Sequence, residues 1–363
     1  MGFMMRFVRF AFGWQAAVVA LAGSFVPWAR AELVPNNDPY FADSWHHAAI
    51  NSPAAWAITT GSAAVRVAVL DAGVYAAHPD LAGRVLTGWN VLTSTSDTSA
   101  ATTHGTAVAG ILGAGLNNGL GVAGMGNFAI VPVKMTTGGS VFSTDAVAAL
   151  NWVAEHAAEQ NIRVALMSYY LRASTAGYLA AVAHVQQAGV LLVESVPNVQ
   201  PPFFRADYVP DEVPGVVQVA GTDHNNLLRS GTGASTTGAA VELVAPSVDI
   251  YTTYYDPSGA DPSLYKVALS GNSWAAPQVA GAAALMWSVN PELTINEVRD
   301  ILYATAQDLG AEGRDNVYGY GLLDAGAAVA EAARLANAPE PSTLVLLAAG
   351  LLGLVCYAWR KRK

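Results

Sequence analysis

Short runs of consecutive apolar residues alternate with longer segments of helical periodicity through the middle of the chain. The apolar runs are rich in Val, Leu and Ile and predict strands at residues 65–70, 130–134, 163–168, 190–195 and 216–221. Helical segments at 143–159 and 174–188 lie between some of them. Continuous apolar strands alternating with helices are typical of a mostly parallel sheet with helices on both faces. The pattern predicts one α/β domain of about 300 residues.

The apolar runs that follow are closer together. "AVELVAP", "VDIYTT" and "YKVALSG", within residues 240–271, predict hairpin-like strands. Two helices finish the domain. The first begins with the capping box Thr294-Ile295-Asn296-Glu297, and the second covers residues 324–336.

The N-terminus has the make-up of a secretory signal peptide. Residues 1–31 contain Arg6 and Arg9, then a long apolar run, and end with Ala29-Arg30-Ala31, an A-x-A cleavage site. The alternative is a short membrane anchor. We expect no long inhibitory prodomain, because only a few residues separate Ala31 from the first domain segment.

The C-terminus carries a second apolar segment. Leu344 to Trp359 are 16 residues without a charge, and the basic cluster 360–363 follows them. A helix of this length rises about 24 Å, short of the ~30 Å hydrocarbon core, but snorkelling flanks would let it cross. We therefore expect attachment to a membrane through this helix, with the basic tail on the cytoplasmic side.

Pro339-Glu340-Pro341 stands just before that segment, and the whole end resembles the PEP-CTERM sorting signal of exported bacterial proteins. The resemblance implies an exosortase-type processing enzyme that cuts near the motif; a permanent anchor is the alternative. Either way we expect an exported protein of the cell envelope or surface. Its expected parts are a signal peptide (1–31), a folded domain (32–336) and a sorting or anchor segment (337–363).

Charge narrows the range of partners. The chain is 53% hydrophobic and 12% charged, and residues 32–341 keep eleven lysines and arginines against all 27 acidic residues, a net charge of −16. Such a domain is a poor candidate for binding nucleic acid or an anionic membrane. The only cysteine, Cys356, lies in the C-terminal apolar segment. With no second cysteine to form a disulfide, the domain must take its stability from a large hydrophobic core, helped by a metal. We expect the protein to be a monomer.

Three separate blocks carry candidate chemistry. Asp71 ends the first strand, and open parallel sheets bind ligands at the carboxyl ends of their strands. The alternative is that Asp71 is only a turn residue, because Asp-x-Gly is also common in turns. His104 begins a helix rich in Gly and Ala, which can pack closely against a neighbouring helix. A lone histidine at the start of a helix is more often a capping residue than a base. Ser273, in "GNSWAAPQVAG", precedes a helix that is apolar almost all round and hence buried. We expect Asn272 or Ser273 to cap this helix, whose dipole and free N–H groups favour an oxyanion there.

Asp71, "HGTAVAG" and "GNSWAAPQVAG", in this order, resemble the three signature blocks of subtilisin-like serine peptidases. The order Asp, His, Ser differs from that in chymotrypsin and the α/β-hydrolases. The segment that begins "NNDPYFADSWHH" resembles the entry of thermitase-like members, and "VYGYGLLDAGAAV" resembles the closing turn and helix. The likeness covers nearly all of residues 35–336 and implies the subtilisin-like three-layer fold.

The resemblance implies a role for each matching residue. Ser273 is the nucleophile, His104 the general base and Asp71 the group that orients the imidazole. Asn198, at the end of "VLLVESVPN", would form the oxyanion hole with the backbone N–H of Ser273. Substrate backbone would pair with Ser168, Tyr169 and Tyr170.

The resemblance also implies a structural Ca²⁺ held by oxygen ligands. The matching residues are Asp38, Asp80, Gly115, Asn118, Leu120 and Val122. The alternative is that Asn117-Asn118-Gly119 is only a turn.

Several positions depart from the family pattern. Asn272 and Trp274 stand where Thr and Met commonly flank the nucleophile, and Tyr170 and Pro197 replace glycines; Gln278 and Ala107 replace histidines. A tyrosine would narrow the main specificity pocket, and the fixed φ of Pro197 would shift Asn198.

The sequence thus predicts an exported serine endopeptidase that acts on proteins or peptides. The alternative is a catalytically impaired surface protein that keeps the fold and binds peptides in an altered cleft. An esterase is disfavoured, because Gly271-x-Ser273-x-Ala275 lacks the second glycine of a nucleophile elbow.

Overall fold

The structure is a computed structural model that describes residues 36–170, 175–199, 213–230, 234–268, 270–338 and 341–362. The expected signal peptide lies outside the described residues. So do Pro339 and Glu340 of the Pro-Glu-Pro motif.

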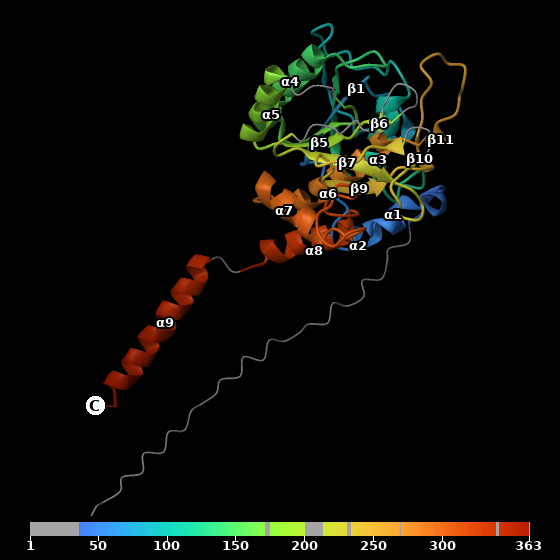
Figure 1. Cartoon of the computed structure of the whole chain (residues 1–363). Coiled ribbons are helices and arrows are strands. Elements are labelled where there is room, and N and C mark those ends of the chain that lie inside the picture. Colours follow the sequence, from blue (N-terminus) through green and yellow to red (C-terminus); the bar gives the residue numbers. More distant parts are fainter. Residues whose placement is uncertain are drawn as a thin grey trace, which may run out of the picture. The chain divides into compact units, whose positions relative to one another are not determined.

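A seven-stranded sheet forms the centre of the domain, in the order β2-β3-β1-β4-β5-β7-β9 (Figure 1). Each neighbouring pair in it is parallel, as the continuous apolar runs predict. Its strands are β1 (Arg66–Asp71), β2 (Trp89–Asn90), β3 (Ala129–Lys134), β4 (Ile162–Met167), β5 (Leu191–Ser195), β7 (Val217–Thr222) and β9 (Leu243–Pro246).

Helices cover both faces of this sheet and bury two hydrophobic clusters against it. One cluster joins the sheet to α3 (His104–Gly113), α6 (Ala276–Val289), α7 (Ile295–Thr305) and α8 (Ala325–Ala336). The other joins it to α4 (Ser143–Gln160) and α5 (Ala176–Gln187), which lie side by side in Figure 1. The predicted three-layer α/β fold is confirmed.

The strands after β7 differ in part from the prediction. β10 (Ile250–Thr253) and β11 (Tyr265–Ala268) do form an antiparallel hairpin. However, β9 lies parallel to β7 and extends the central sheet, so the expectation of a hairpin there was wrong. A two-residue pair, β6 (Asn198–Val199) with β8 (Ala234–Ser235), lies outside that sheet.

Local signals fix the ends of several helices. The capping box of α7 is present, with the Thr294 hydroxyl accepting from Glu297 N and the Glu297 carboxylate accepting from Thr294 N. Asp324 caps α8 by accepting from Ala327 N. The entry segment folds into three short helices, η1 (Phe41–Asp43), α1 (His46–Ala49) and α2 (Ser52–Trp56).

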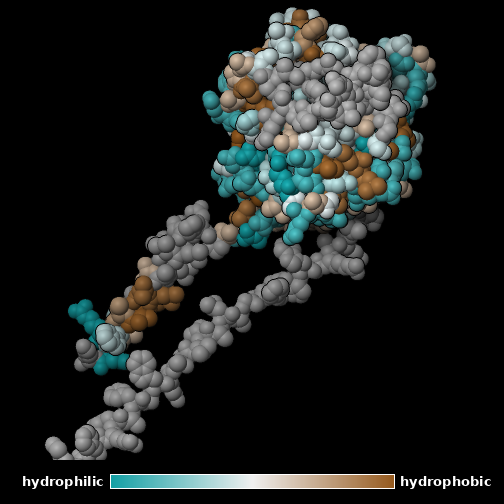
Figure 2. Space-filling model, viewed as in Figure 1, coloured by the Kyte–Doolittle hydropathy of each residue, from teal (hydrophilic) through white to brown (hydrophobic). Residues whose placement is uncertain are grey.

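The C-terminal segment forms α9 (Pro341–Arg360), so its helical character is as expected. Large apolar side chains are exposed along its C-terminal half, as Figure 2 shows, among them Leu352 and Trp359. Among the described residues, however, no helix combines the length and apolar character needed to cross a membrane. The expectation that Leu344–Trp359 spans a membrane therefore has no support in the described part of the chain.

Small residues let the buried helices approach their neighbours closely. Gly281 lies within α6, and a Cβ built on it would be only 2.3 Å from Met125 Cβ. Gly110 faces the hairpin, where its Cβ would be 2.2 Å from Thr253 Oγ1. The Gly- and Ala-rich composition of these helices therefore reflects close packing.

We expect Gly281→Ala to lower the free energy of unfolding by about 1–3 kcal/mol, because even one methyl group overpacks this contact. Gly177→Ala is the matched control. Gly177 is exposed in the first turn of α5, where a Cβ would meet only Thr175 Oγ1 at 4.0 Å. Its replacement by alanine should therefore leave the free energy of unfolding unchanged or raise it slightly. Urea unfolding followed by circular dichroism measures both; equal effects would contradict the packing argument.

Candidate active site

The order of the strands reverses between β1 and β4. From β1 the chain passes to β2 and β3 on one side and then returns to β4 on the other. Crevices at the carboxyl ends of parallel strands, at such a reversal, are where α/β sheets bind ligands. Asp71 ends β1 and Ser168 directly follows β4, so both lie at this edge.

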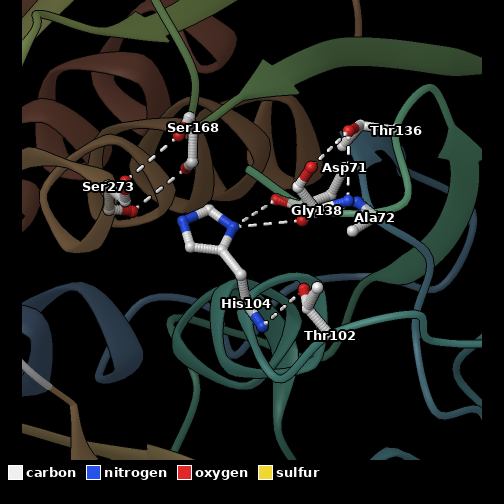
Figure 3. A network of polar contacts seen from close by, with 8 residues as sticks. All are labelled: Asp71, Ala72, Thr102, His104, Thr136, Gly138, Ser168 and Ser273. Carbon is white, nitrogen blue, oxygen red and sulfur yellow. Dashed lines mark hydrogen bonds and ion pairs between the residues drawn. The ribbon is translucent and has the colours of Figure 1, made fainter. Parts of the chain in front are cut away.

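A buried carboxylate at this edge holds the histidine. Asp71 is fully buried, and its Oδ1 accepts from the N–H of Ala72 at 2.7 Å. His104 Nδ1 lies 3.0 Å from Asp71 Oδ1 and 2.9 Å from Oδ2. Because a carboxylate only accepts, Nδ1 carries the proton and Nε2 of the neutral ring is left to accept one. Figure 3 shows the imidazole between Asp71 and Ser273.

Opposing effects act on the pKa of His104. Burial lowers it, but the charge and hydrogen bond of Asp71 raise it by more, so the net shift is upward from the usual value. The imidazolium is therefore stabilised at this position.

Ser273 lies in the 3₁₀ turn η3 (Asn272–Trp274), just before α6, and is buried. Its hydroxyl donates to the carbonyl oxygen of Ser168 at 3.1 Å, and the Ser168 hydroxyl donates back to the Ser273 carbonyl at 3.0 Å (Figure 3). The structure thus brings Ser273 to the same edge as His104, with its proton directed at Ser168.

The expectation that Asn272 or Ser273 caps α6 was wrong. The helix follows the 3₁₀ turn directly, and its N-terminal flanking residue is Ala275, with no side-chain cap. The buried Asn272 amide instead donates to the carbonyls of Val196 and Pro197 and accepts from Gly221 N. It joins the Ser273 turn to the loop after β5 and to strand β7. Pro277 lies in the first turn of α6, where the missing N–H of proline costs little.

Asn198 reaches the same region from the start of β6, three residues after the end of β5. Its Oδ1 accepts from Asn272 N at 2.9 Å and from Arg229 Nη2 at 2.5 Å. These donors fix the orientation of the amide, because only its oxygen accepts. Its nitrogen is directed toward the turn before Ser273: a Cβ built on Gly271 would lie 3.9 Å from Asn198 Nδ2.

Two aromatic rings flank His104. The Tyr169 ring lies 5.0 Å from the imidazole and the Trp274 ring 5.2 Å, measured between centroids. Tyr169 and Tyr170 are half-buried. Burial, with a smaller effect from Asp71, raises the pKa of Tyr169, so it stays neutral. Trp274, one of the replacements noted in the sequence, therefore lies beside the candidate base together with Tyr169.

The residues expected to bind calcium come together between the entry segment and the loop after α3. The carboxylate of Asp38 accepts from the N–H groups of Asn117, Asn118 and Gly119. The carboxylate of Asp80 accepts from Gly115 N, Val122 N and the Asn118 amide.

The chemistry of this cluster suits a cation. Both carboxylates are almost fully buried, and burial, with a smaller effect from the charge of Asp38, raises the pKa of Asp80 despite its hydrogen bonds. A Cβ on Gly115 would lie 1.9 Å from Asn118 Nδ2, so only glycine leaves room for the Asn118 side chain beside Asp80. Yet the part of the chain that the structure describes has no group of three His, Cys, Asp or Glu residues that could hold a metal.

The sequence model of the subtilase family matches residues 62–321. The chain belongs to the subtilase family. It is therefore a serine-type endopeptidase. The PEP-CTERM protein-sorting motif matches residues 337–363, so both resemblances noted in the sequence are confirmed.

Individual subtilases match over most of their length. Thermitase from Thermoactinomyces vulgaris is 33% identical over 292 residues, which are 78% of this chain and 97% of thermitase. Subtilisin Savinase from Lederbergia lenta is 32% identical over 284 residues, 78% of this chain and 97% of Savinase. A solved protease structure from Pseudoalteromonas arctica has a TM-score of 0.69 and 27% identity, covering 82% of this chain and all of the other.

Sequence reasoning on this subtilase missed Arg229 and misassigned Asn272. Arg229 lies in a polar loop, "NNLLRSGTGAS", where nothing marks it as buried. The sequence did offer a signal for Asn272, since an asparagine is unusual next to the proposed nucleophile. That signal does not reveal the hydrogen-bond partners of Asn272.

We expect the acid limb of the pH profile of kcat/KM to lie above the ordinary histidine value of about 6.5, because the base must be neutral and its pKa is raised. Asp71→Asn removes the raising charge and leaves the lowering effect of burial, so the limb should move to lower pH while activity falls. His184→Gln, in α5, is the control that should leave the limb in place. A limb unmoved by Asp71→Asn would contradict the assigned cause.

Proposed function

We propose that this subtilase is exported and cleaves protein or peptide substrates through Asp71, His104 and Ser273. The observation that carries the proposal is the Asp71–His104 hydrogen bond at the sheet edge that also holds Ser273. The family membership supports the same reaction class.

In the proposed mechanism the Ser273 hydroxyl turns from Ser168 to His104 when substrate binds. Its oxygen attacks the scissile carbonyl carbon and its proton passes to His104 Nε2. The tetrahedral intermediate collapses to an acyl-enzyme as the imidazolium gives that proton to the leaving amine, and water then releases the acyl group by the same steps. Asp71 stays ionised throughout and stabilises the imidazolium.

The carbonyl oxygen becomes negatively charged in the tetrahedral intermediate. We assign its stabilisation to the Asn198 amide and the backbone N–H of Ser273. The orientation of the Asn198 amide supports this, since its oxygen is occupied and its nitrogen is directed toward the Ser273 turn. Loss of one such donor in a subtilisin costs about 3 kcal/mol of transition-state stabilisation. We place the substrate backbone along Ser168, Tyr169 and Tyr170.

A Ca²⁺ ion would be held by the cluster around Asp38 and Asp80. The ligands would be the two carboxylates, the Asn118 side chain and the carbonyls of Gly115, Leu120 and Val122, an all-oxygen set. When bound, the ion supplies charge compensation to two buried carboxylates. Because the cluster joins the entry segment to the loop after α3, it would stabilise the fold.

Export and sorting follow from the two ends of the chain. Residues 1–31 are proposed as the signal peptide, 32–336 as the peptidase domain and 337–363 as the sorting segment. The PEP-CTERM match supports processing by an exosortase-type enzyme, which would deliver the domain to the cell envelope or surface.

A fluorophosphonate probe tests the catalytic assignment. We expect it to label the wild-type domain once, and we expect Ser273→Ala to abolish both labelling and peptide hydrolysis with the melting temperature unchanged. Ser270→Ala, three residues before the nucleophile and exposed, is the matched control. A folded wild type that takes no label in calcium buffer would favour the impaired, peptide-binding alternative.

Chelation tests the calcium assignment without measuring activity. At free calcium a hundredfold above Kd, binding contributes about 2.7 kcal/mol to the free energy of unfolding, so a chelator should lower the melting temperature by several degrees. Asp80→Asn should remove most of this response, whereas Asp256→Asn, in an outer loop, should keep it. A melting temperature indifferent to chelator would reject the site.

A further inference from the structure

Arg229 is buried beside the proposed oxyanion hole. Only 3% of the residue is exposed, and its Nη2 donates to Asn198 Oδ1 at 2.5 Å and to Asn272 Oδ1 at 3.4 Å. Within the described part of the chain, its Nε and Nη1 are buried without a hydrogen-bond partner. Burying a guanidinium with unsatisfied donors is destabilising, which points to a role other than stability.

The position of this side chain determines how Asn198 is oriented. The Asn198 oxygen accepts from Arg229 on one side and from Asn272 N on the other. With the oxygen held by two donors, the NH₂ group must face the opposite way, toward the turn that carries Ser273.

The charge adds to this geometric effect. Burial lowers the pKa of Arg229 to about 10, so the guanidinium stays positive at neutral pH. A cation that donates to an amide oxygen polarises the amide and strengthens its N–H as a donor.

We propose that Arg229 is a positioning residue for the oxyanion hole: its guanidinium holds the Asn198 oxygen and aims the Asn198 NH₂ group at the substrate oxyanion. This inference rests on the proposed function, in particular on the role of Asn198. Because Arg229 acts through Asn198, its contribution must disappear when the Asn198 amide is absent.

A double-mutant cycle tests this dependence. Arg229→Met should lower kcat about tenfold with KM changed less than twofold, because it weakens the hydrogen bond from Asn198 to the oxyanion, which is made only in the transition state. In the Asn198→Ala background the same substitution should change kcat less than twofold. Arg229→Gln keeps a neutral donor and should restore part of the rate, and it carries the test if Arg229→Met does not fold.

Arg163→Met is the matched control. Arg163 lies near the start of β4, at the opposite end of that strand from Ser168, and donates to Pro291 O. It should keep wild-type kcat.

Two outcomes would overturn the proposal: folded Arg229 variants with wild-type kcat, or an equal loss of kcat in both backgrounds. Failure of the proposed function itself is recognised separately, because the folded wild type would then take no fluorophosphonate label or Ser273→Ala would retain hydrolysis.

Discussion

His104 can reach Asp71 only because the residue after it has no side chain. A Cβ on Gly105 would lie 2.2 Å from the carbonyl oxygen of Gly73 and 2.9 Å from Asp71 Oδ1. The first turn of α3 therefore rests directly on the loop that follows β1. This approach depends on the buried face of α3, which packs against α6 and the sheet. The core thus fixes the distance between His104 and Asp71, which lie 33 residues apart in the sequence.

The polar groups around Ser273 form a second framework with few charges. Asn272, Asn198 and Ser235 connect the Ser273 turn to β6, β7 and β8 through buried and partly buried hydrogen bonds, among them one between Ser235 Oγ and Asn272 Oδ1. Such bonds are strongly directional and costly to leave unmade in a low-dielectric interior. These bonds hold the loops of the site in one arrangement. Among the described residues, Arg229 adds the one buried positive charge of that framework.

Much of the architecture could be predicted from the sequence, because its signals are local. Apolar runs placed β1, β3, β4, β5 and β7 to within about a residue, and the capping box placed α7. The direction of β9 could not be predicted, since a four-residue apolar run fits a hairpin or a parallel edge equally well. The partners of Asn272 and the burial of Arg229 depend on loops distant in sequence, so no local pattern reveals them.

The two edges of the central sheet bear on how this protein behaves in concentrated solution. One edge, β2, is only two residues long, and the other, β9, is covered in part by the chain around Leu322, which forms a parallel bridge to Val244. Exposed edge strands are templates on which other chains add and aggregate, and shortening or covering them prevents this. Although the central sheet is apolar, the folded domain thus offers little open backbone with which another chain could pair. Unfolded segments of the chain would have to pair with one another before they could pair with the folded domain.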